Sequence, residues 1–329
     1  MIAELSNKRP VKSPASAGLF IGAILLLLLL TGCVTPQVQR LNQQWPADLP
    51  DRVLLSSTPF FPQEDFECGP AALATLLQTS GVEVTPEQLA PQVFLPGRKG
   101  SLQIELLVAS RRHGLPAYQL TPTLATVLQE VAAGHPVLVF QNISLPVYPI
   151  WHYAVVIGFD RTRQMMTLRS GVTAQLEMSL SVFERTWARG EYWAMVALPV
   201  SQLPASAEPE SMIAAVAALE RLNPQAAHSA YSTALQRWPA QPLLLMGSGN
   251  ASYALGDRTA AAAAYSAAAQ ADPTLADAWN NLAQVLMEQG QRDEALQALR
   301  KALTLGGPRL AIYQQLERQL LAKPTGSAP

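Results

Sequence analysis

The stretch that decides the fold is PQEDFECGPAALATLL, residues 62–77. It places Cys68 directly before an apolar run, with Pro70 near the first helical positions and Gly81 at the expected C-terminal stop. A helix over this run would hold the thiol at its N-terminus, where peptide dipoles and free N–H groups stabilise a thiolate or an oxyanion. The stretch therefore predicts a nucleophilic cysteine at the start of a helix.

The helix dipole alone does not activate a thiol. Lowering a cysteine pKa from about 8.5 to about 6.5 takes roughly 2.7 kcal/mol, so an imidazole is expected downstream. The candidate is His152, in Trp151-His152-Tyr153. The alternative for Cys68 is a buried small hydrophobic residue, the commoner environment of a lone cysteine.

Length and composition limit the classes of protein. The 329 residues, 49% of them hydrophobic, provide for about two domains with real cores. A net charge of -1 argues against a protein that binds nucleic acid through a basic surface. His135 and His228 have no cysteine or histidine neighbours at metal-ligand spacing, so we expect no metal site and no cofactor.

The first 32 residues have the pattern of a secretory signal. Basic residues precede the apolar run 17–30, which ends in Leu30-Thr31-Gly32-Cys33. The alternative, a membrane-spanning helix, is disfavoured because 14 residues extend roughly 21 Å and a hydrocarbon core is roughly 30 Å thick. The four residues resemble the bacterial lipobox, which implies cleavage before Cys33 and acylation of its thiol. Val34 in place of aspartate resembles sorting to the outer membrane, so the expected location is its periplasmic face in the cell envelope.

Residues 33–51 are polar, contain three prolines and show no periodicity, so they are predicted to be a tether. Residues 52–200 form the first predicted domain. Helices are expected after residues 68, 85, 101 and 123, and strands at 53–55, 136–140, 153–159 and 165–168. Helices followed by an antiparallel sheet predict an α+β fold.

Three sequence features occur in a particular order in the first predicted domain. Gln63, the run Cys68-Gly69-Pro70, and the pentapeptide His152-Tyr153-Ala154-Val155-Val156 occur together over residues 62–200. This combination resembles the papain-like bacteriocin-processing cysteine peptidases that cut after double-glycine leaders. The resemblance implies that Cys68 is the nucleophile, His152 the general base and acid, and Gln63 an oxyanion-hole donor.

The third catalytic residue departs from that pattern. The family has an aspartate on the strand after the histidine strand, but eight residues of strand place Asp160 about 26 Å from His152, in the turn. The residue facing His152 is expected near Ser170, and the window 168–172 contains no carboxylate. Ser170 could orient the imidazole but not stabilise imidazolium as an anion would. An active peptidase and a slow or inactive descendant therefore both stay open.

Residues 201–209 are predicted to be a linker, and residues 210–322 a repeat domain. Ala230-Tyr231-Ser232 recurs as Ala264-Tyr265-Ser266, an offset of 34. A 34-residue period of paired helices indicates tetratricopeptide repeats, so the second part is expected to be an all-α solenoid that binds a protein partner. An unrelated helical bundle is the alternative.

Three hypotheses follow. In the first, a lipid-anchored cysteine peptidase hydrolyses a protein or peptide substrate that its repeats recruit. In the second, the papain-like domain has lost turnover and binds peptides as a scaffold. In the third, the repeats carry the function and the first domain is a spacer. The chain has no Walker-type loop, so the exporter-linked role of the resembling peptidases does not transfer directly.

Overall fold

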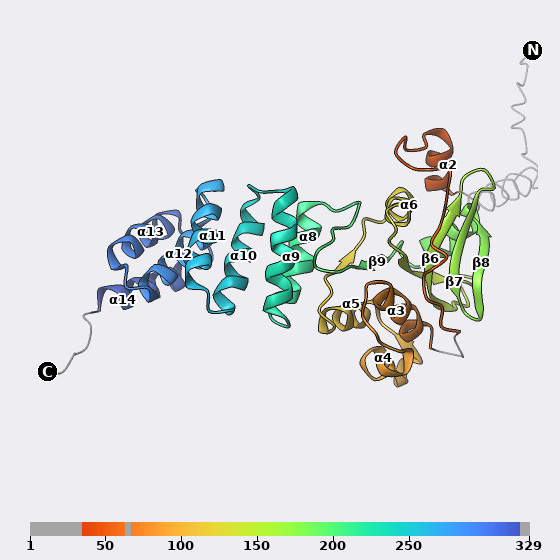
Figure 1. Cartoon of the computed structure of the whole chain (residues 1–329), viewed down its shortest axis with the longest axis horizontal. Coiled ribbons are helices and arrows are strands. Elements are labelled where there is room, and N and C mark those ends of the chain that lie inside the picture. Colours follow the sequence, from red (N-terminus) through yellow and green to blue (C-terminus); the bar gives the residue numbers. More distant parts are fainter. Residues whose placement is uncertain (1–34, 63–66, 323–329) are drawn as a thin grey trace, which may run out of the picture.

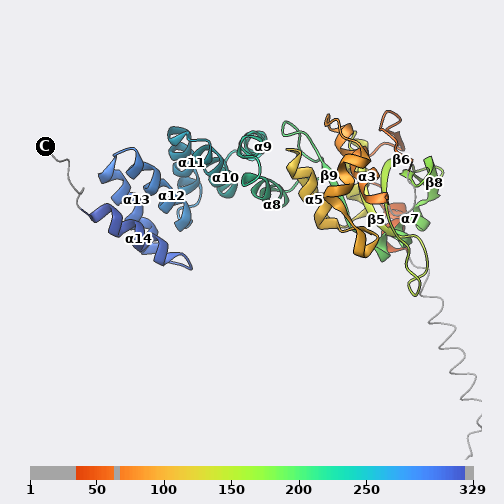
Figure 2. The same cartoon turned by 90° about the horizontal axis from the view of Figure 1, so that it is seen from below.

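A computed structural model describes residues 35–62 and 67–322, in which an α/β domain is followed by a row of helices (Figures 1 and 2). The predictions for the signal segment, Cys33 and Gln63 lie outside the described residues. The predicted fold class, an α+β domain followed by an all-α repeat region, is confirmed. Within the described ranges, no helix is both long enough and apolar enough to cross a membrane.

The central sheet is antiparallel throughout and has the strand order β4-β9-β5-β6-β7-β8, with β1 paired to β6. Side chains of its inner strands point alternately into two hydrophobic cores, one on each face of the sheet. In β5, Val137 and Val139 belong to one core and Leu138 to the other. The strands are β1 (Arg52–Leu54), β4 (Ala117–Gln119), β5 (Val137–Asn142), β6 (Trp151–Asp160), β7 (Met165–Ser170), β8 (Thr173–Ser179) and β9 (Ala194–Ala197).

Three helices cover one face of the sheet: α3 (Cys68–Thr79), α4 (Pro86–Val93) and α5 (Gln103–Arg112). Helix α3 is buried along most of its length, because it lies between the sheet and its two neighbours. A small hairpin of β2 (Phe94–Leu95) and β3 (Gly100–Ser101) follows α4, with η2 (Pro96–Arg98) in its turn. This hairpin borders the N-terminus of α3.

The opposite face is covered by α6 (Leu124–Ala132), α7 (Leu180–Arg189) and α2 (Pro36–Gln43). The tether predicted over residues 33–51 is therefore wrong for α2, whose Val38 and Leu41 are buried in this core. The carboxylate of Glu184 on α7 accepts hydrogen bonds from the backbone N–H groups of Gln37 and Val38, at 3.0 and 2.7 Å. A distant residue thus caps the first turn, where Thr35 makes no side-chain capping hydrogen bond.

The repeat region is built from helices that recur at the predicted period. Helices α9 (Pro224–Arg237), α11 (Arg258–Ala271) and α13 (Arg292–Leu305) begin 34 residues apart, as do α10 (Pro242–Ala254) and α12 (Ala276–Glu288). Helix α8 (Pro209–Glu220) completes the first pair, and α14 (Leu310–Leu321) ends the stack. Figure 1 shows these helices as a row that extends from the α/β domain.

The two parts of the chain share one hydrophobic core. Met212 and Val216 of α8 belong to the same buried cluster as Tyr118 and Val196 of the sheet. The first repeat helix is therefore packed against the sheet edge formed by β4.

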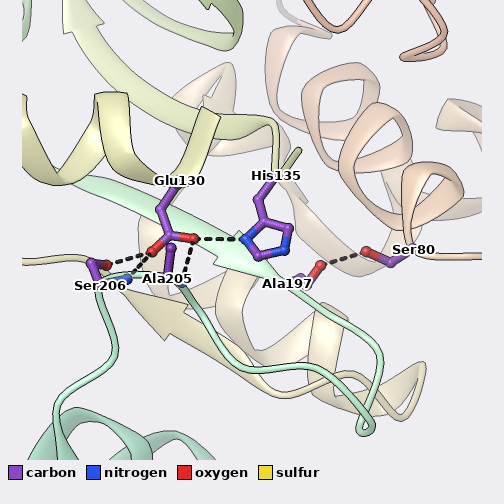
Figure 3. A network of polar contacts seen from close by, with 6 residues as sticks. All are labelled: Ser80, Glu130, His135, Ala197, Ala205 and Ser206. Carbon is purple, nitrogen blue, oxygen red and sulfur yellow. Dashed lines mark hydrogen bonds and ion pairs between the residues drawn. The ribbon is translucent and has the colours of Figure 1, made fainter. Parts of the chain in front are cut away.

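A buried carboxylate holds the connection between the two parts (Figure 3). Glu130 of α6 accepts hydrogen bonds from the backbone N–H groups of Ala205 and Ser206, at 3.2 and 2.8 Å, and from the Ser206 hydroxyl. Its other contact is His135 Nδ1, at 2.8 Å. The segment predicted as a linker, 201–209, is thus fastened to the α/β domain.

Candidate active site

The thiol of Cys68 lies at the first residue of α3 and is half-buried. The helix begins where the sequence predicted, and the N–H of Ala71 donates to the carbonyl of Glu67 at 3.1 Å to close the first turn. Hydrogen bonding by the backbone N–H groups of Gly69 and Cys68 acts to lower the pKa of the Cys68 thiol. The helix start therefore presents both a nucleophile and hydrogen-bond donors.

Cys68 and His152 line the same cavity, of about 780 Å³. The sequence places these residues 84 positions apart, and the packing of α3 against β6 brings them together. One wall comes from the β2–β3 hairpin and the start of α5, and the other from the connection between β5 and β6. The remaining lining residues are Arg98, Lys99, Gly100, Ser101, Leu102, Gln103, Phe140, Pro149, Ile150, Trp151, Tyr153 and Gly171.

His152 is oriented by a hydroxyl. Its Nε2 lies 2.9 Å from Oγ of Ser170, the last residue of β7. Val155 pairs with Arg169, so the register places Ser170 opposite Ala154 and diagonally from His152, on the same face of the sheet and within the window 168–172 that was predicted. When Nε2 carries the proton and donates to Ser170, Nδ1 is unprotonated and can accept the proton of a thiol.

Asp160 is remote from this contact, as its distance along the strand predicted. It pairs with Met165 at the far end of the β6–β7 hairpin, and its carboxylate accepts a hydrogen bond from the backbone N–H of Arg163 at 2.9 Å. Its other partner is Arg52, at 3.8 Å. Asp160 therefore shapes the turn. The catalytic roles of Cys68 and His152 stay predictions from the resemblance, and the orienting role of Ser170 stays a prediction from the strand register.

Burial favours the uncharged forms of both catalytic candidates. It raises the pKa of the Cys68 thiol, although backbone hydrogen bonds from Tyr153, Gly69 and Cys68 itself act in the opposite direction. It also lowers the pKa of His152. The resting pair is thus a neutral thiol and a neutral imidazole, since no carboxylate contacts the ring among the described residues.

Close packing fixes the start of α3. A Cβ atom at Gly69 would lie 2.2 Å from Oγ and 2.6 Å from Cβ of Ser101, so only glycine fits here. The Ser101 carbonyl accepts a hydrogen bond from the Tyr153 hydroxyl at 3.1 Å. The Ser101 hydroxyl is buried, lines the cavity and has no hydrogen-bond partner in the part of the chain that the structure describes.

Two features of the site were not predicted from the sequence. One is the backbone N–H of Tyr153 as a donor to the sulfur, and no local signal identifies it. The other is the part of the apolar wall that Pro149 and Ile150 form, in the connection between β5 and β6. An uncharged, proline-containing run between two predicted strands was the available signal. In the described ranges, no three His, Cys, Asp or Glu side chains are grouped as a metal ion would require.

Comparisons with known proteins agree with this organisation. The model of the Peptidase_C39 like family matches residues 56–194, and models of the TPR repeat and the tetratricopeptide repeat match residues 249–290 and 276–305. No curated protein matches the chain.

Two solved structures are similar in part. One is described as a C39-like peptidase from Bacillus anthracis, with 20% identity and a TM-score of 0.38 over 45% of this chain and 98% of that one. The other is MamA protein, with 18% identity and a TM-score of 0.29 over 33% of this chain and 63% of that one. The family models by themselves support a Peptidase C39-like domain at residues 56–194, followed by tetratricopeptide repeats at residues 249–305.

Proposed function

We propose that this chain is a lipid-anchored cysteine peptidase of the bacterial cell envelope that hydrolyses peptide bonds of a protein or peptide substrate. The proposal depends on one observation: a thiol at a helix N-terminus and an imidazole oriented by a hydroxyl line one cavity. Thiol peptidases need a nucleophile, a base and a group that orients the base.

The reaction would begin with transfer of the Cys68 proton to Nδ1 of His152. The thiolate then attacks the substrate carbonyl carbon, and the C–N bond breaks as His152 returns the proton to the leaving amine. Water, deprotonated by His152, hydrolyses the thioester and regenerates the thiol. The developing oxyanion would be stabilised by the backbone N–H of Cys68 and, as the resemblance implies, by the side chain of Gln63.

A second candidate is a peptide-binding domain with weak or no turnover. It is favoured by the raised pKa of Cys68 and by a hydroxyl where a carboxylate would stabilise imidazolium. In this candidate the same cavity would hold a peptide without cleaving it.

The anchor and the repeats complete the proposal. Residues 1–32 would be removed as a signal peptide, and acylated Cys33 would hold the protein at the periplasmic face of the outer membrane. The repeats would recruit the substrate or another protein partner. They enclose a groove of about 540 Å³ whose amides suit hydrogen bonding to peptide backbone; its lining is Asn250, Tyr253, Tyr265, Asn280, Asn281, Gln284, Ile312, Gln315, Leu316 and Gln319.

The proposal is tested in two ways, by the reactivity of the Cys68 thiol and by the cleavage products that depend on it. Alkylation of the processed protein by iodoacetamide at neutral pH, located by mass spectrometry, should occur at Cys68 and slow strongly in His152→Ala. N-terminal peptides of the envelope proteome should include cleavage products that disappear in cells carrying Cys68→Ala. Alkylation that is independent of His152, or identical N-terminal peptides in both strains, would leave the peptide-binding candidate.

A further inference from the structure

The connection between β5 and β6 exposes a cluster of large hydrophobic side chains. We call residues 143–151 the apolar hairpin; Figure 2 shows this connection extending beyond the sheet. Six of its nine residues are hydrophobic and 48% to 78% exposed: Ile143, Leu145, Val147, Tyr148, Ile150 and Trp151. Other exposed hydrophobic residues of the described chain are distributed over many separate elements, as on ordinary soluble surfaces.

The tip of the apolar hairpin is a formed structure. The N–H of Ile143 donates to the carbonyl of Ile150 at 3.0 Å, and the N–H of Tyr148 donates to the carbonyl of Leu145 at 3.1 Å. These bonds close a tight turn from which the apolar side chains project. Because these backbone groups are hydrogen-bonded to each other, their transfer from water into lipid costs less free energy than the transfer of unpaired groups.

The base of the hairpin is held by polar side chains. Oδ1 of Asn142 accepts from the backbone N–H groups of Ser144 and Ile150, both at 3.0 Å. The carbonyl of Ser144 accepts from Nη1 of Arg189 on α7, at 2.7 Å. No charged residue occurs between positions 137 and 151. The hairpin therefore presents an uncharged apolar tip above a base that Arg189 makes cationic.

Helix α7 also fixes where the chain enters the domain. Its Glu184 caps the first turn of α2, and its Arg189 holds the hairpin, five residues and about 7.5 Å further along the helix axis. Thr35, the first described residue, directly precedes α2. Thr35 therefore lies at the end of α2 that is held by α7, the helix that also supports the apolar hairpin.

We propose that the apolar hairpin inserts its tip into the interface of a lipid bilayer. Leucine, valine and isoleucine side chains would bury apolar surface there, tyrosine and tryptophan favour the headgroup level, and Arg189 suits anionic lipids. Because Pro149, Ile150 and Trp151 also line the Cys68 cavity, insertion would open that cavity next to the membrane. Substrate segments close to the membrane would then reach the thiol first. Membrane contact through the apolar hairpin would be additional to the acyl anchor and would not require it.

The test uses residues 34–329 without an acyl chain, because all core clusters lie between Val38 and Leu320. Binding is measured by co-sedimentation with vesicles of phosphatidylethanolamine and phosphatidylglycerol, and by tryptophan quenching with brominated chains. The double variant Val147→Asp/Tyr148→Asp should bind vesicles at least about tenfold more weakly than the wild type, since two exposed apolar side chains become charged. The matched control Leu222→Asp/Leu255→Asp changes exposed residues of the repeats and should bind as the wild type does.

The proposal is overturned if the wild-type chain does not bind vesicles, or if the hairpin variant binds them equally well. It is also overturned if the wild type forms a dimer that the hairpin variant loses while vesicle binding is absent, because the hairpin would then contact a second copy. Unchanged vesicle binding with loss of peptide-substrate cleavage would assign the hairpin to the substrate instead. Cys68 alkylation, measured on the same samples, reports separately on the proposed function.

Discussion

Nε2 of His152 lies 2.9 Å from the hydroxyl oxygen of Ser170. A hydroxyl can fix the tautomer and the orientation of the ring, but it cannot offset the positive charge that the ring acquires when it takes a proton. Burial opposes that charge as well, since it lowers the pKa of His152. The site therefore orients the base well and stabilises its protonated form poorly.

Ser170→Asp is expected to activate the thiol. A carboxylate in contact with Nε2 would stabilise imidazolium, which favours the thiolate–imidazolium pair. We expect the rate of Cys68 alkylation at neutral pH to rise about tenfold, and cleavage to rise with it. The rate is followed with iodoacetamide over a pH series. Ser170→Asn, which places an uncharged group of similar size there, is the matched control, and a rate no higher in Ser170→Asp than in Ser170→Asn would refute the charge argument.

The wild-type thiol should react slowly at neutral pH. Burial raises the pKa of Cys68, so the reactive thiolate forms at higher pH than it does for an ordinary cysteine. Burial also lowers the pKa of His152, so no resting imidazolium stabilises a thiolate near neutrality, and His152 speeds alkylation by accepting the thiol proton during the attack. Alkylation rates should increase with pH through and above the ordinary cysteine range. A plateau that is already complete at pH 7 would show an ion pair in the resting enzyme and contradict this account.

Much of the site follows from local sequence patterns. The proline and apolar run after Cys68 define α3, and strand alternation with a short turn places Ser170 near His152 on the same face of the sheet. The 34-residue recurrence predicts the helix pairs of the repeats. Each of these predictions depends on spacing within one element or between neighbouring elements.

The features that escaped prediction depend on contacts between distant residues. Helix α2 is capped by Glu184, and the segment after the sheet is held by Glu130, at separations that no window of sequence covers. The apolar hairpin has no period of helix or strand, so its composition alone did not define a structure. Long-range capping and the exposure of a hydrophobic turn are determined by packing, which requires coordinates.

Gly69→Ala should disturb both stability and the thiol. The added Cβ would lie 2.2 Å from Oγ and 2.6 Å from Cβ of Ser101, so the start of α3 and the β2–β3 hairpin must separate. Overpacking of this kind costs about 1–3 kcal/mol, which urea unfolding would measure. Alkylation of Cys68 should change as its position shifts. Gly97→Ala, where a Cβ meets nothing within 4 Å, is the control; equal stability of the two variants would contradict the packing argument.

Glu130→Gln should loosen the joint between the two parts of the chain. Burial raises the pKa of Glu130, but hydrogen bonds from His135 and Ser206 outweigh it, so the net shift is downward. A lowered carboxyl pKa contributes stability above the unfolded pKa of about 4.5, and this stability is lost as pH falls through the folded pKa. The variant should lose about 2–3 kcal/mol of unfolding free energy at neutral pH, because an amide cannot accept every bond at this buried site.

Segment 201–209 of the Glu130→Gln variant should also become more sensitive to protease. Glu177→Gln breaks an exposed, solvent-screened pair with Arg163 and should cost much less; equal losses in both variants would show that Glu130 does not hold the joint.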